Sequence, residues 1–516
     1  MIESVVYPSS FIIAMSGLAL WMLLEGKKSF SGLASFVFLC GLIAWAASVF
    51  LVEADTSDKI MVAARDLLAM GFVSILMRQV RTNKAVALAL FIGTGFFVRF
   101  SYLDILKNSF STKPAISLNK TFDQHQPELL VDIRSSDDLG KLKNLLEPYS
   151  SSVLPAFAPA EPGDTDLDDY YLVDVESSDR EEVHQLLAQS QLVDWVEENE
   201  SVHADPLLNV NEGSGSSTRI ASNDPLAAQQ WALEMLDCGN VYQLLEAQEQ
   251  TRKKIRVAVL DTGVDAEHPD LKSHYVSTKR AYDRDVRGHG THVAGIVAGI
   301  TGNNLGIASL LPPNQDFLQI TSIKVLSDMG GGTQAGIING MIEAADKGAH
   351  VISMSLGGRS NDKKQKAYDD AVKYCNDRGA IVVVSAGNAN NNSKLLSPAN
   401  AKGVIAVTAT DQTGNKASFS SMIQDLEFGI AAPGVEIMST WPGGKYRNSS
   451  GTSMAAPYVS SLVGLMLSVN PDLKTAEIHA LLDQHGATTS QVKQTGKRIQ
   501  PAVVLEAMLE LEPAAL

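Results

Sequence analysis

Four polar residues in the second half of the chain have types and positions that suit nucleophilic catalysis. Asp261 directly follows the apolar run IRVAVL, and Asn388 closes the run AIVVVSAGN. His289 lies in RGHGTHVAG, and Ser453 lies in SGTSMAAP. A serine hydroxyl is a weak nucleophile at neutral pH and needs an adjacent base, which histidine supplies when an aspartate fixes its tautomer. These residue types therefore predict acyl transfer with a serine nucleophile.

Acyl transfer also needs hydrogen-bond donors for the negative charge that develops on the attacked carbonyl oxygen. Ser453 precedes a predicted helix at Met454–Leu467, so its backbone N–H would lie at a helix N-terminus. The Asn388 side-chain amide is the second candidate donor. A strand-end aspartate alone is usually a turn residue, and a serine before a helix is usually an N-cap. The four residues taken together favour catalysis.

Short apolar strands and the helices between them are expected to position these groups. The predicted strands are Ile255–Leu260, Gln319–Leu326, Val351–Leu356, Ala380–Ala386 and Val404–Ala409, and the predicted helices include Ala335–Lys347 and Lys364–Arg378. Near-continuous apolar strands that alternate with helices predict a parallel sheet buried on both faces. Functional groups collect at the carboxyl ends of such strands, where the candidate residues stand.

The blocks DTGVD, HGTHVAG, SAGN and GTSMAAP occur in that order and resemble the signature blocks of subtilases. The resemblance covers about residues 224–469 and includes the preceding sequence QQWAL. It implies a subtilisin-like α/β fold, with a parallel sheet flanked by helices, and a serine endopeptidase activity. The implied catalytic triad is Asp261, His289 and Ser453. The implied oxyanion hole is formed by Asn388 and Ser453.

The same resemblance implies two extended segments that hold a substrate strand between them. The implied substrate-binding residues, in MGGGT and SLGG, are Gly330, Gly331, Gly332, Ser355, Leu356 and Gly357. Glycines let a peptide backbone approach and add as a β-strand, which predicts tolerance of substrate sequence. Ala389 stands where some relatives carry an acid that lines the primary pocket. An apolar or uncharged side chain is therefore expected before the cleaved bond.

No cofactor and no metal ligand are predicted. Relatives often bind calcium near the loop after the histidine helix, but that loop, ITGNNLGIAS, is short here. Calcium therefore enters by family analogy alone, without an identifiable site. Cys40, Cys238 and Cys375 have no metal-site spacing and are expected to be unpaired thiols. His268 and His292 are expected to have structural roles.

The N-terminal region is strongly apolar. Its four apolar stretches are Tyr7–Leu24, Leu33–Val52, Ile60–Met77 and Ala85–Leu103. Each has about the 20 residues needed for a membrane-spanning helix. Arg65 and Asp66 lie inside the third stretch, so whether that stretch spans the membrane is left open. Basic residues follow the first and third stretches and acidic residues follow the second, which predicts that the rest of the chain lies on the extracytoplasmic face. A helical bundle within a soluble protein is the alternative.

Residues 118–203 are predicted to form a small α+β domain. Its predicted strands are Leu129–Ile133, Val153–Phe157, Tyr170–Val175 and Val193–Asn199, and its predicted helices are about Ser135–Leu146 and Arg180–Gln189. The order β-α-β-β-α-β is the ferredoxin-like arrangement. The domain resembles the subtilase propeptide, whose last strand is similar to VDWVEENESV. That resemblance implies a folding chaperone and an intramolecular inhibitor, with self-cleavage within about residues 201–223.

Four parts are therefore predicted along the 516 residues. They are a transmembrane region (1–110, about four spans), the prodomain (118–203), a flexible linker (204–223) and the catalytic domain (224–512). The net charge of -16 and the lack of a basic patch argue against nucleic-acid binding. The expected partners are protein or peptide substrates, the prodomain itself and the lipid bilayer. The alternative function is a membrane signalling or partner-binding protein with little general proteolysis.

Overall fold

The computed structural model describes residues 14, 18, 28–51, 128–161, 163, 165–204, 222–247, 252–360 and 366–511. The chain divides into two units, Met1–Ser117 and Leu118–Leu516. In the first unit, helix α2 (Lys28–Leu51) covers the second apolar stretch. The third and fourth stretches, and nearly all of the first, lie outside the described residues.

Among the described residues, one helix has the length and hydropathy needed to cross a membrane, namely α13 (Thr452–Val469). It is 94% buried inside the protein, so it is a core helix of the second unit. Membrane crossing by the N-terminal region therefore stays a prediction.

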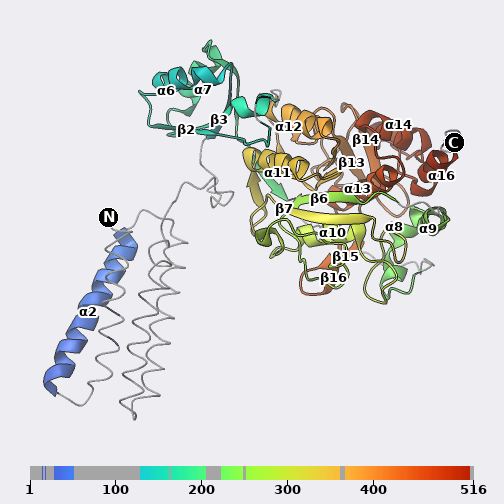
Figure 1. The fold of residues 1–516 in the computed structure, drawn as a ribbon, viewed down its shortest axis with the longest axis horizontal. Coiled ribbons are helices and arrows are strands. Elements are labelled where there is room, and N and C mark those ends of the chain that lie inside the picture. The colour runs from blue at the N-terminus through green and yellow to red at the C-terminus, as the bar shows by residue number, and fades with distance from the viewer. Residues whose placement is uncertain are drawn as a thin grey trace. The chain divides into compact units, whose positions relative to one another are not determined.

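A six-stranded parallel sheet forms the centre of the second unit (Figure 1). Its strand order is β14-β13-β11-β9-β6-β7. The strands are β6 (Ile255–Asp261), β7 (Leu318–Lys324), β9 (Val351–Met354), β11 (Ile381–Ser385), β13 (Ile405–Thr410) and β14 (Gly429–Pro433). The sequence analysis identified all of them except β14, whose run GIAAP is short and contains glycine and proline, which are rare in strands.

Helices bury both faces of this sheet. Helices α10 (His289–Ala298) and α13 pack on one face, while α11 (Gln334–Asp346) and α12 (Lys366–Asp377) pack on the other (Figure 1). Along β6, Val257 and Val259 belong to the first core, and Ala258 and Leu260 belong to the second. Successive strand residues point to opposite faces, and because both faces are buried, the strands are mostly apolar and do not alternate with polar residues.

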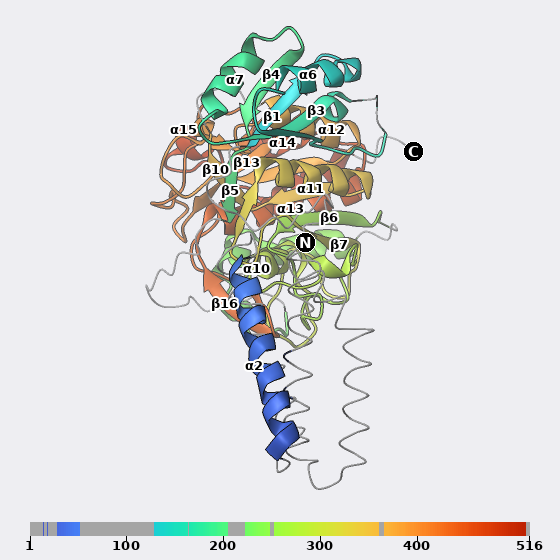
Figure 2. The ribbon, with the colours of Figure 1, turned by 90° about the vertical axis from the view of Figure 1, so that its left-hand side faces the viewer.

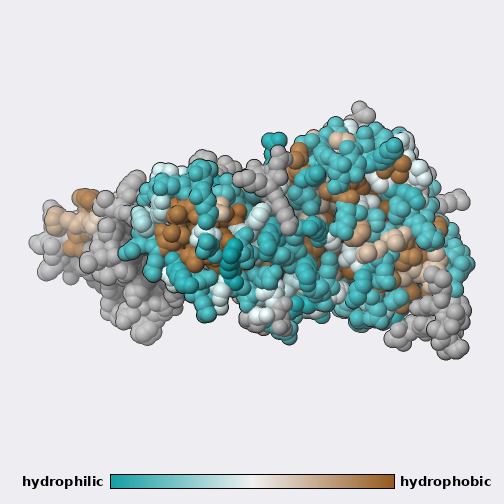
Figure 3. Space-filling view, turned by 90° about the horizontal axis from the view of Figure 1, so that it is seen from above, coloured by the Kyte–Doolittle hydropathy of each residue, from teal (hydrophilic) through white to brown (hydrophobic). Residues whose placement is uncertain are grey.

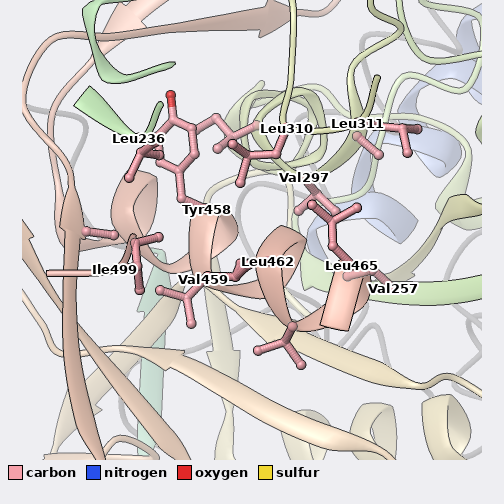
Figure 4. Close-up of a cluster of buried hydrophobic side chains, with 14 of the residues drawn as sticks. Leu236, Val257, Val297, Leu310, Leu311, Tyr458, Val459, Leu462, Leu465 and Ile499 are labelled. Carbon is pink, nitrogen blue, oxygen red and sulfur yellow. The ribbon is translucent and has the colours of Figure 1, made fainter. Parts of the chain in front are cut away.

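Helix α13 is at the centre of the first core. Figure 4 shows Val459, Leu462 and Leu465 of α13 in one apolar cluster with Val257 of β6 and Val297 of α10. Each buried side chain of this kind contributes about 1.5–3 kcal/mol of transfer free energy. This packing fixes the N-terminal ends of α10 and α13 relative to the sheet. The remaining elements of this part are α8 (Trp231–Met235), α9 (Cys238–Glu246), α14 (Thr475–His485), α15 (Val492–Thr495), α16 (Pro501–Leu511) and the hairpin β15 (Ile437–Trp441) and β16 (Lys445–Ser449).

Residues 128–204, called the small unit below, contain a separate antiparallel sheet of order β2-β3-β1-β4. Its elements are β1 (Glu128–Ile133), α6 (Leu139–Leu145), β2 (Ser151–Pro155), β3 (Tyr170–Val175), α7 (Arg180–Gln189) and β4 (Val193–Glu198). Leu129 and Val131 of β1 pack with Leu142 of α6 and with Val183 and Leu187 of α7. The helices therefore cover one face of this sheet.

The other face of the small sheet packs on α11 and α12 (Figure 2). Leu130 and Tyr170 belong to the same apolar core as these helices. The Tyr170 hydroxyl donates to Asp370 at 2.8 Å, and Lys366 pairs with Asp132 at 2.8 Å. The small unit is therefore packed against the main part of the second unit (residues 222–511) through both apolar and ionic contacts.

The small unit ends in strand β5 (Ser201–Ala204), which leaves its own sheet. It joins a second sheet of order β12-β10-β5-β8, antiparallel to β8 (Gly331–Thr333) and to β10 (Leu356–Arg359), while β12 (Leu396–Ser397) pairs with β10. One predicted strand, Val351–Leu356, is in fact split between β9 and β10. The chain leaves the parallel sheet at Ser355 because the residues after it pair with β5 and β12.

On the face shown in Figure 3, hydrophilic residues predominate among those described, and hydrophobic residues occur in small groups. Among the described residues outside α2, the exposed large apolar side chains are Leu154, Val286, Leu305, Met329 and Val503. Such scattered apolar residues are ordinary on soluble protein surfaces.

Candidate active site

Asp261 and His289 form a fully buried pair. Asp261 is the last residue of β6, and His289 is the first residue of α10. His289 Nδ1 lies 2.9 Å and 2.8 Å from the two Asp261 carboxylate oxygens, and both side chains are 0% exposed. A carboxylate only accepts hydrogen bonds, so Nδ1 carries the proton and Nε2 is the basic nitrogen.

The close approach of α10 to β6 requires a glycine at position 290. A Cβ on Gly290 would lie 2.1 Å from the Gly263 carbonyl oxygen and 3.0 Å from Asp261 Cβ. These atoms belong to the backbone or are attached directly to it, so they could not move aside without shifting β6. Any side chain at this position would therefore push His289 away from Asp261.

Asp285 is a buried carboxylate that the sequence analysis did not identify. Its Oδ1 accepts from Gly288 N at 2.8 Å and from the Thr262 hydroxyl at 2.9 Å. Its Oδ2 accepts from the backbone N and the hydroxyl of Thr291, both at 2.8 Å. Asp285 therefore caps the N-terminus of α10 and ties it to the turn after β6. The sequence offered one weak signal, an acidic residue shortly before His289, in a segment with other charges.

Ser453 lies in the first turn of α13 and is 1% exposed. Its hydroxyl donates to the Ser355 carbonyl oxygen at 3.3 Å, and the Ser355 hydroxyl donates to the Ser453 carbonyl oxygen at 2.9 Å. These two hydrogen bonds join the start of α13 to the segment between β9 and β10. Ser453 is thereby held at the point where the second sheet begins.

Asn388 presents a side-chain N–H beside the start of α13. Its Oδ1 accepts from the backbone N and the hydroxyl of Thr452, at 2.8 Å and 2.9 Å. Its Nδ2 is buried and has no hydrogen-bond partner in the described part of the chain. A Cβ placed on Gly451 would lie 3.2 Å from Asn388 Nδ2 and 3.6 Å from Ser453 N, so both donors border one small space. A buried N–H without a partner costs folding free energy, and a negatively charged oxygen bound in this space would supply the missing acceptor.

The six predicted substrate-binding residues line two extended walls with β5 between them. One wall contains Gly330, Gly331 and Gly332, and the other contains Ser355, Leu356 and Gly357. Ala204 lies opposite Leu356, and its backbone N donates to the Gly330 carbonyl oxygen at 2.8 Å. A strand of the chain itself therefore occupies the place where a substrate strand was expected.

A pocket of about 300 Å³ adjoins the end of β5. Ala204 lines one side, and Asn388, Ala389, Leu396 and Arg359 are among the residues that line the rest. The pocket thus borders the Asn388 amide. Ala389 lies in it as the sequence analysis expected, and Arg359 adds a charge that the sequence analysis did not consider.

His268 and His292 bind backbone carbonyls of the β15–β16 hairpin. His268 Nε2 lies 3.0 Å from the Lys445 carbonyl oxygen, and His292 Nε2 lies 2.9 Å from that of Arg447. Burial lowers the pKa of His292 to about 3, so it stays neutral. These contacts agree with the structural roles expected for both residues. The three cysteines are unpaired, as expected.

The loop after α10 lies between two carboxylates. Asp224 accepts from Gly302 N at 2.7 Å and Asn303 N at 3.0 Å, and Asp270 accepts from Asn303 Nδ2 at 2.7 Å. Within the described residues, no group of three or more His, Cys, Asp or Glu could hold a metal ion. The oxygens of Asp224 and Asp270 already accept these N–H groups, and Asn303 presents its Nδ2 and not its oxygen to Asp270. As placed in the described part of the chain, these three residues therefore do not fit a calcium ion.

The region that carries these residues is similar to proteins of known activity. Residues 252–498 match the Subtilase family. The chain is 38% identical over 252 residues to thermitase of Thermoactinomyces vulgaris, which covers 48% of this chain and 85% of thermitase. It is also 38% identical over 241 residues to subtilisin DY of Bacillus licheniformis, which covers 45% of this chain and 84% of that protein.

A solved protease structure from Pseudoalteromonas arctica has a similar fold. The TM-score is 0.50 at 26% sequence identity, and the match covers 56% of this chain and 100% of the other. This likeness agrees with the predicted parallel sheet flanked by helices. With thermitase matched over most of its length at this level of identity, the chain belongs to the subtilase family and is a serine endopeptidase.

Proposed function

We propose that the chain is a membrane-anchored endopeptidase that uses Asp261, His289 and Ser453 as its catalytic triad and is held inactive by its small unit. The catalytic assignment rests chiefly on one observation. The fully buried His289–Asp261 pair occurs together with an Asn388 Nδ2 donor that borders Ser453 N and has no partner among the described residues.

In the proposed reaction, His289 Nε2 takes the proton from the Ser453 hydroxyl as its oxygen attacks the substrate carbonyl carbon. Asp261 holds the Nδ1 proton and stabilises the imidazolium. The oxyanion accepts hydrogen bonds from Ser453 N and Asn388 Nδ2. His289 then protonates the leaving amine, and an acyl-enzyme forms. Water, deprotonated by His289, hydrolyses that ester and restores the Ser453 hydroxyl.

The small unit is proposed to inhibit the enzyme by occupying the substrate cleft. Its strand β5 pairs with both walls through backbone hydrogen bonds. Val202 and Ala204 of this strand are buried in the core that also contains Leu356. Another peptide could enter the cleft only after β5 leaves, so release of the small unit would be the activating step.

The small unit is also proposed to assist folding of the main part. Glu197 accepts from the backbone N of Lys366 at 2.9 Å and of Ala367 at 3.3 Å, at the N-terminus of α12. The Asn199 side-chain oxygen accepts from Ala335 N at 2.9 Å, at the N-terminus of α11. First-turn N–H groups lack partners inside their own helix, so these side chains would stabilise two helices that cover the sheet.

Self-cleavage within about residues 201–223 is proposed as the route to release. The support is that β5 runs along the cleft toward the pocket beside Asn388. Cutting there would separate the catalytic part from the N-terminal region unless the pieces stay bound. The apolar stretches of that region are the basis for proposing a multi-pass anchor with the protease on the extracytoplasmic face.

The test is an electrophoretic time course of the purified wild type beside Ser453→Ala, with a casein digest in parallel. We expect the wild type to yield a fragment of catalytic-domain size and to cleave casein, and the variant to do neither. Cleavage of casein by the variant would overturn the role of Ser453. A wild type that digests casein while staying full length would overturn the self-processing proposal alone.

A further inference from the structure

Arg359 gives the pocket beside β5 a positive charge. It is the last residue of β10, and its backbone pairs with Leu396 of β12. Its side chain is exposed, and it forms no ion pair or side-chain hydrogen bond with any residue that the structure describes. The other residues that line the pocket are Gly, Ala, Ser, Leu, Asn and His, so no carboxylate balances this guanidinium there.

Strand β5 shows which substrate residue would meet the pocket. Ala204 lies opposite Leu356 in antiparallel pairing, and Ala204 also lines the pocket. One step back along that wall is Ser355, whose carbonyl oxygen accepts from the Ser453 hydroxyl. A substrate residue that follows the position of Ala204 would therefore lie opposite Ser355 and beside the nucleophile. Its side chain is the one that precedes the cleaved bond.

We propose that Arg359 makes this pocket select substrates with an acidic side chain, Asp or Glu, immediately before the cleaved bond. The inference rests on the proposed role of Ser453 and names the substrate class for that site. A guanidinium matches a carboxylate with two parallel N–H donors. Ala389 and Leu396 would contact the methylene groups of such a side chain. A lysine or arginine in the substrate would instead meet a like charge.

A second guanidinium lies along the opposite wall. Arg287 Nη1 donates to the Met329 carbonyl oxygen at 2.6 Å. A Cβ on Gly330 would lie 2.7 Å from the Arg287 Cζ, so the guanidinium lies against the backbone of this wall. The cleft is thus bordered by an arginine on each side. Both charges favour an acidic peptide over a basic one.

An acidic residue comes directly after strand β5 in the sequence. Ala204 is followed in the sequence by Asp205. The peptide segment that occupies the cleft therefore continues with the type of residue that Arg359 would select. The sequence predicted an apolar or uncharged side chain at this position from Ala389 alone. The structure adds Arg359 to the residues that line the pocket.

The test compares peptides that differ only in the residue before the cleaved bond. Each carries the sequence ESVHA, then Asp, Asn, Glu, Gln, Leu or Lys, then an aminocoumarin leaving group. We expect kcat/KM for Asp over Asn, and for Glu over Gln, to be higher by about 2- to 5-fold at low salt, because the ion pair is partly open to solvent. High salt should reduce both ratios.

Variants of the full chain assign the preference to one side chain. Arg359→Gln should bring both ratios close to one, and Arg359→Glu should make the Lys peptide better than the Asp peptide. Arg280→Gln, which changes an exposed arginine outside the pocket, should leave the ratios unchanged. Each ratio compares two peptides cleaved by the same variant, so a lower fraction of folded enzyme reduces both rates equally and leaves the ratio unchanged.

Two results would overturn the inference. Equal cleavage of the Asp and Asn peptides, or ratios that survive Arg359→Gln, would remove the role of Arg359 while leaving the proposed catalysis intact. If the wild type cleaves none of the peptides and a serine-directed phosphonate does not label Ser453, the proposed function itself is overturned, and the inference with it.

Discussion

The active centre and the interface of the small unit differ in how their buried polar groups are hydrogen-bonded. In the active centre, Asn388 Nδ2 is buried without a partner among the described residues. At the interface, the buried Glu197 carboxylate accepts four hydrogen bonds. Besides the two from α12, these come from Gln334 Nε2 at 2.7 Å and Trp195 Nε1 at 2.6 Å.

We call the active centre the reacting region, because its unpaired donor is placed to bind a reaction intermediate. We call the interface of the small unit the holding region, because its polar groups are paired with one another and stabilise the fold. An unpaired donor lowers stability in the resting state and becomes favourable only when an oxyanion forms. A buried carboxyl group whose oxygens already accept hydrogen bonds is satisfied within the fold and leaves no polar atom for a ligand. Substitutions in the first region should therefore change turnover more than stability, and substitutions in the second should do the reverse.

The largest expected effect is that of Ser453→Ala. Removing the nucleophile should lower kcat by at least about 10⁴-fold, since the remaining groups cannot form the acyl-enzyme. Thermal unfolding of the variant should change little, because the hydrogen bond from the hydroxyl to the Ser355 carbonyl oxygen is long, at 3.3 Å. A large loss of stability in this variant would contradict the proposed division between reacting and holding regions.

Asn388→Ala tests the unpaired donor. We expect kcat to fall by about 10²- to 10³-fold with little change in KM, because the amide would bind the oxyanion more strongly than the substrate carbonyl. Thr452→Val is the matched control, because it removes a hydroxyl that bonds the Asn388 oxygen and not the Nδ2 donor. A rise in KM at constant kcat for Asn388→Ala would argue against an oxyanion role.

Asp285→Asn tests the cap that positions His289. An amide in place of the carboxylate would present N–H groups to at least one of its four donors, so the start of α10 should shift. We expect a fall in kcat of about 10-fold and a loss of stability of about 1–3 kcal/mol, measured by denaturant unfolding. Asp283→Asn is the control, because Asp283 accepts from Tyr275 and Ser277 outside α10. Equal effects of both variants would remove the special role of Asp285.

The sequence predicted the sheet and the four catalytic candidates because both depend on local patterns. Strand β6 is an apolar run, interrupted at Arg256, that ends at Asp261, and Ser453 stands at the start of an apolar helix. The missed features depend on tertiary contacts. Asp285 is identified only by its burial, and the break at Ser355 exists because residues distant in the chain pair with β10. Nothing in the local sequence at Arg359 indicates that it lines a pocket.

The smallest expected effect is a pH dependence from the interface. Burial raises the pKa of Glu197 to about 7 and that of Asp132 to about 6, whereas in the unfolded chain both carboxyls titrate near their ordinary values. The folded form therefore binds protons more tightly. The stabilising contribution is complete below the unfolded pKa values and is lost as pH rises toward 7.

We expect Ser453→Ala, which keeps the small unit attached, to lose about 1–2 kcal/mol between pH 5 and pH 8 in denaturant unfolding. Glu197→Gln should weaken this dependence, because a glutamine does not titrate and only the contribution of Asp132 remains. Glu198→Gln, on the exposed side of the same strand, should leave it unchanged. An unfolding free energy that rises with pH, or one that depends on Glu198 instead, would show that the paired carboxylate is held in its charged form. The reacting and holding regions would then differ in pairing alone and not in protonation.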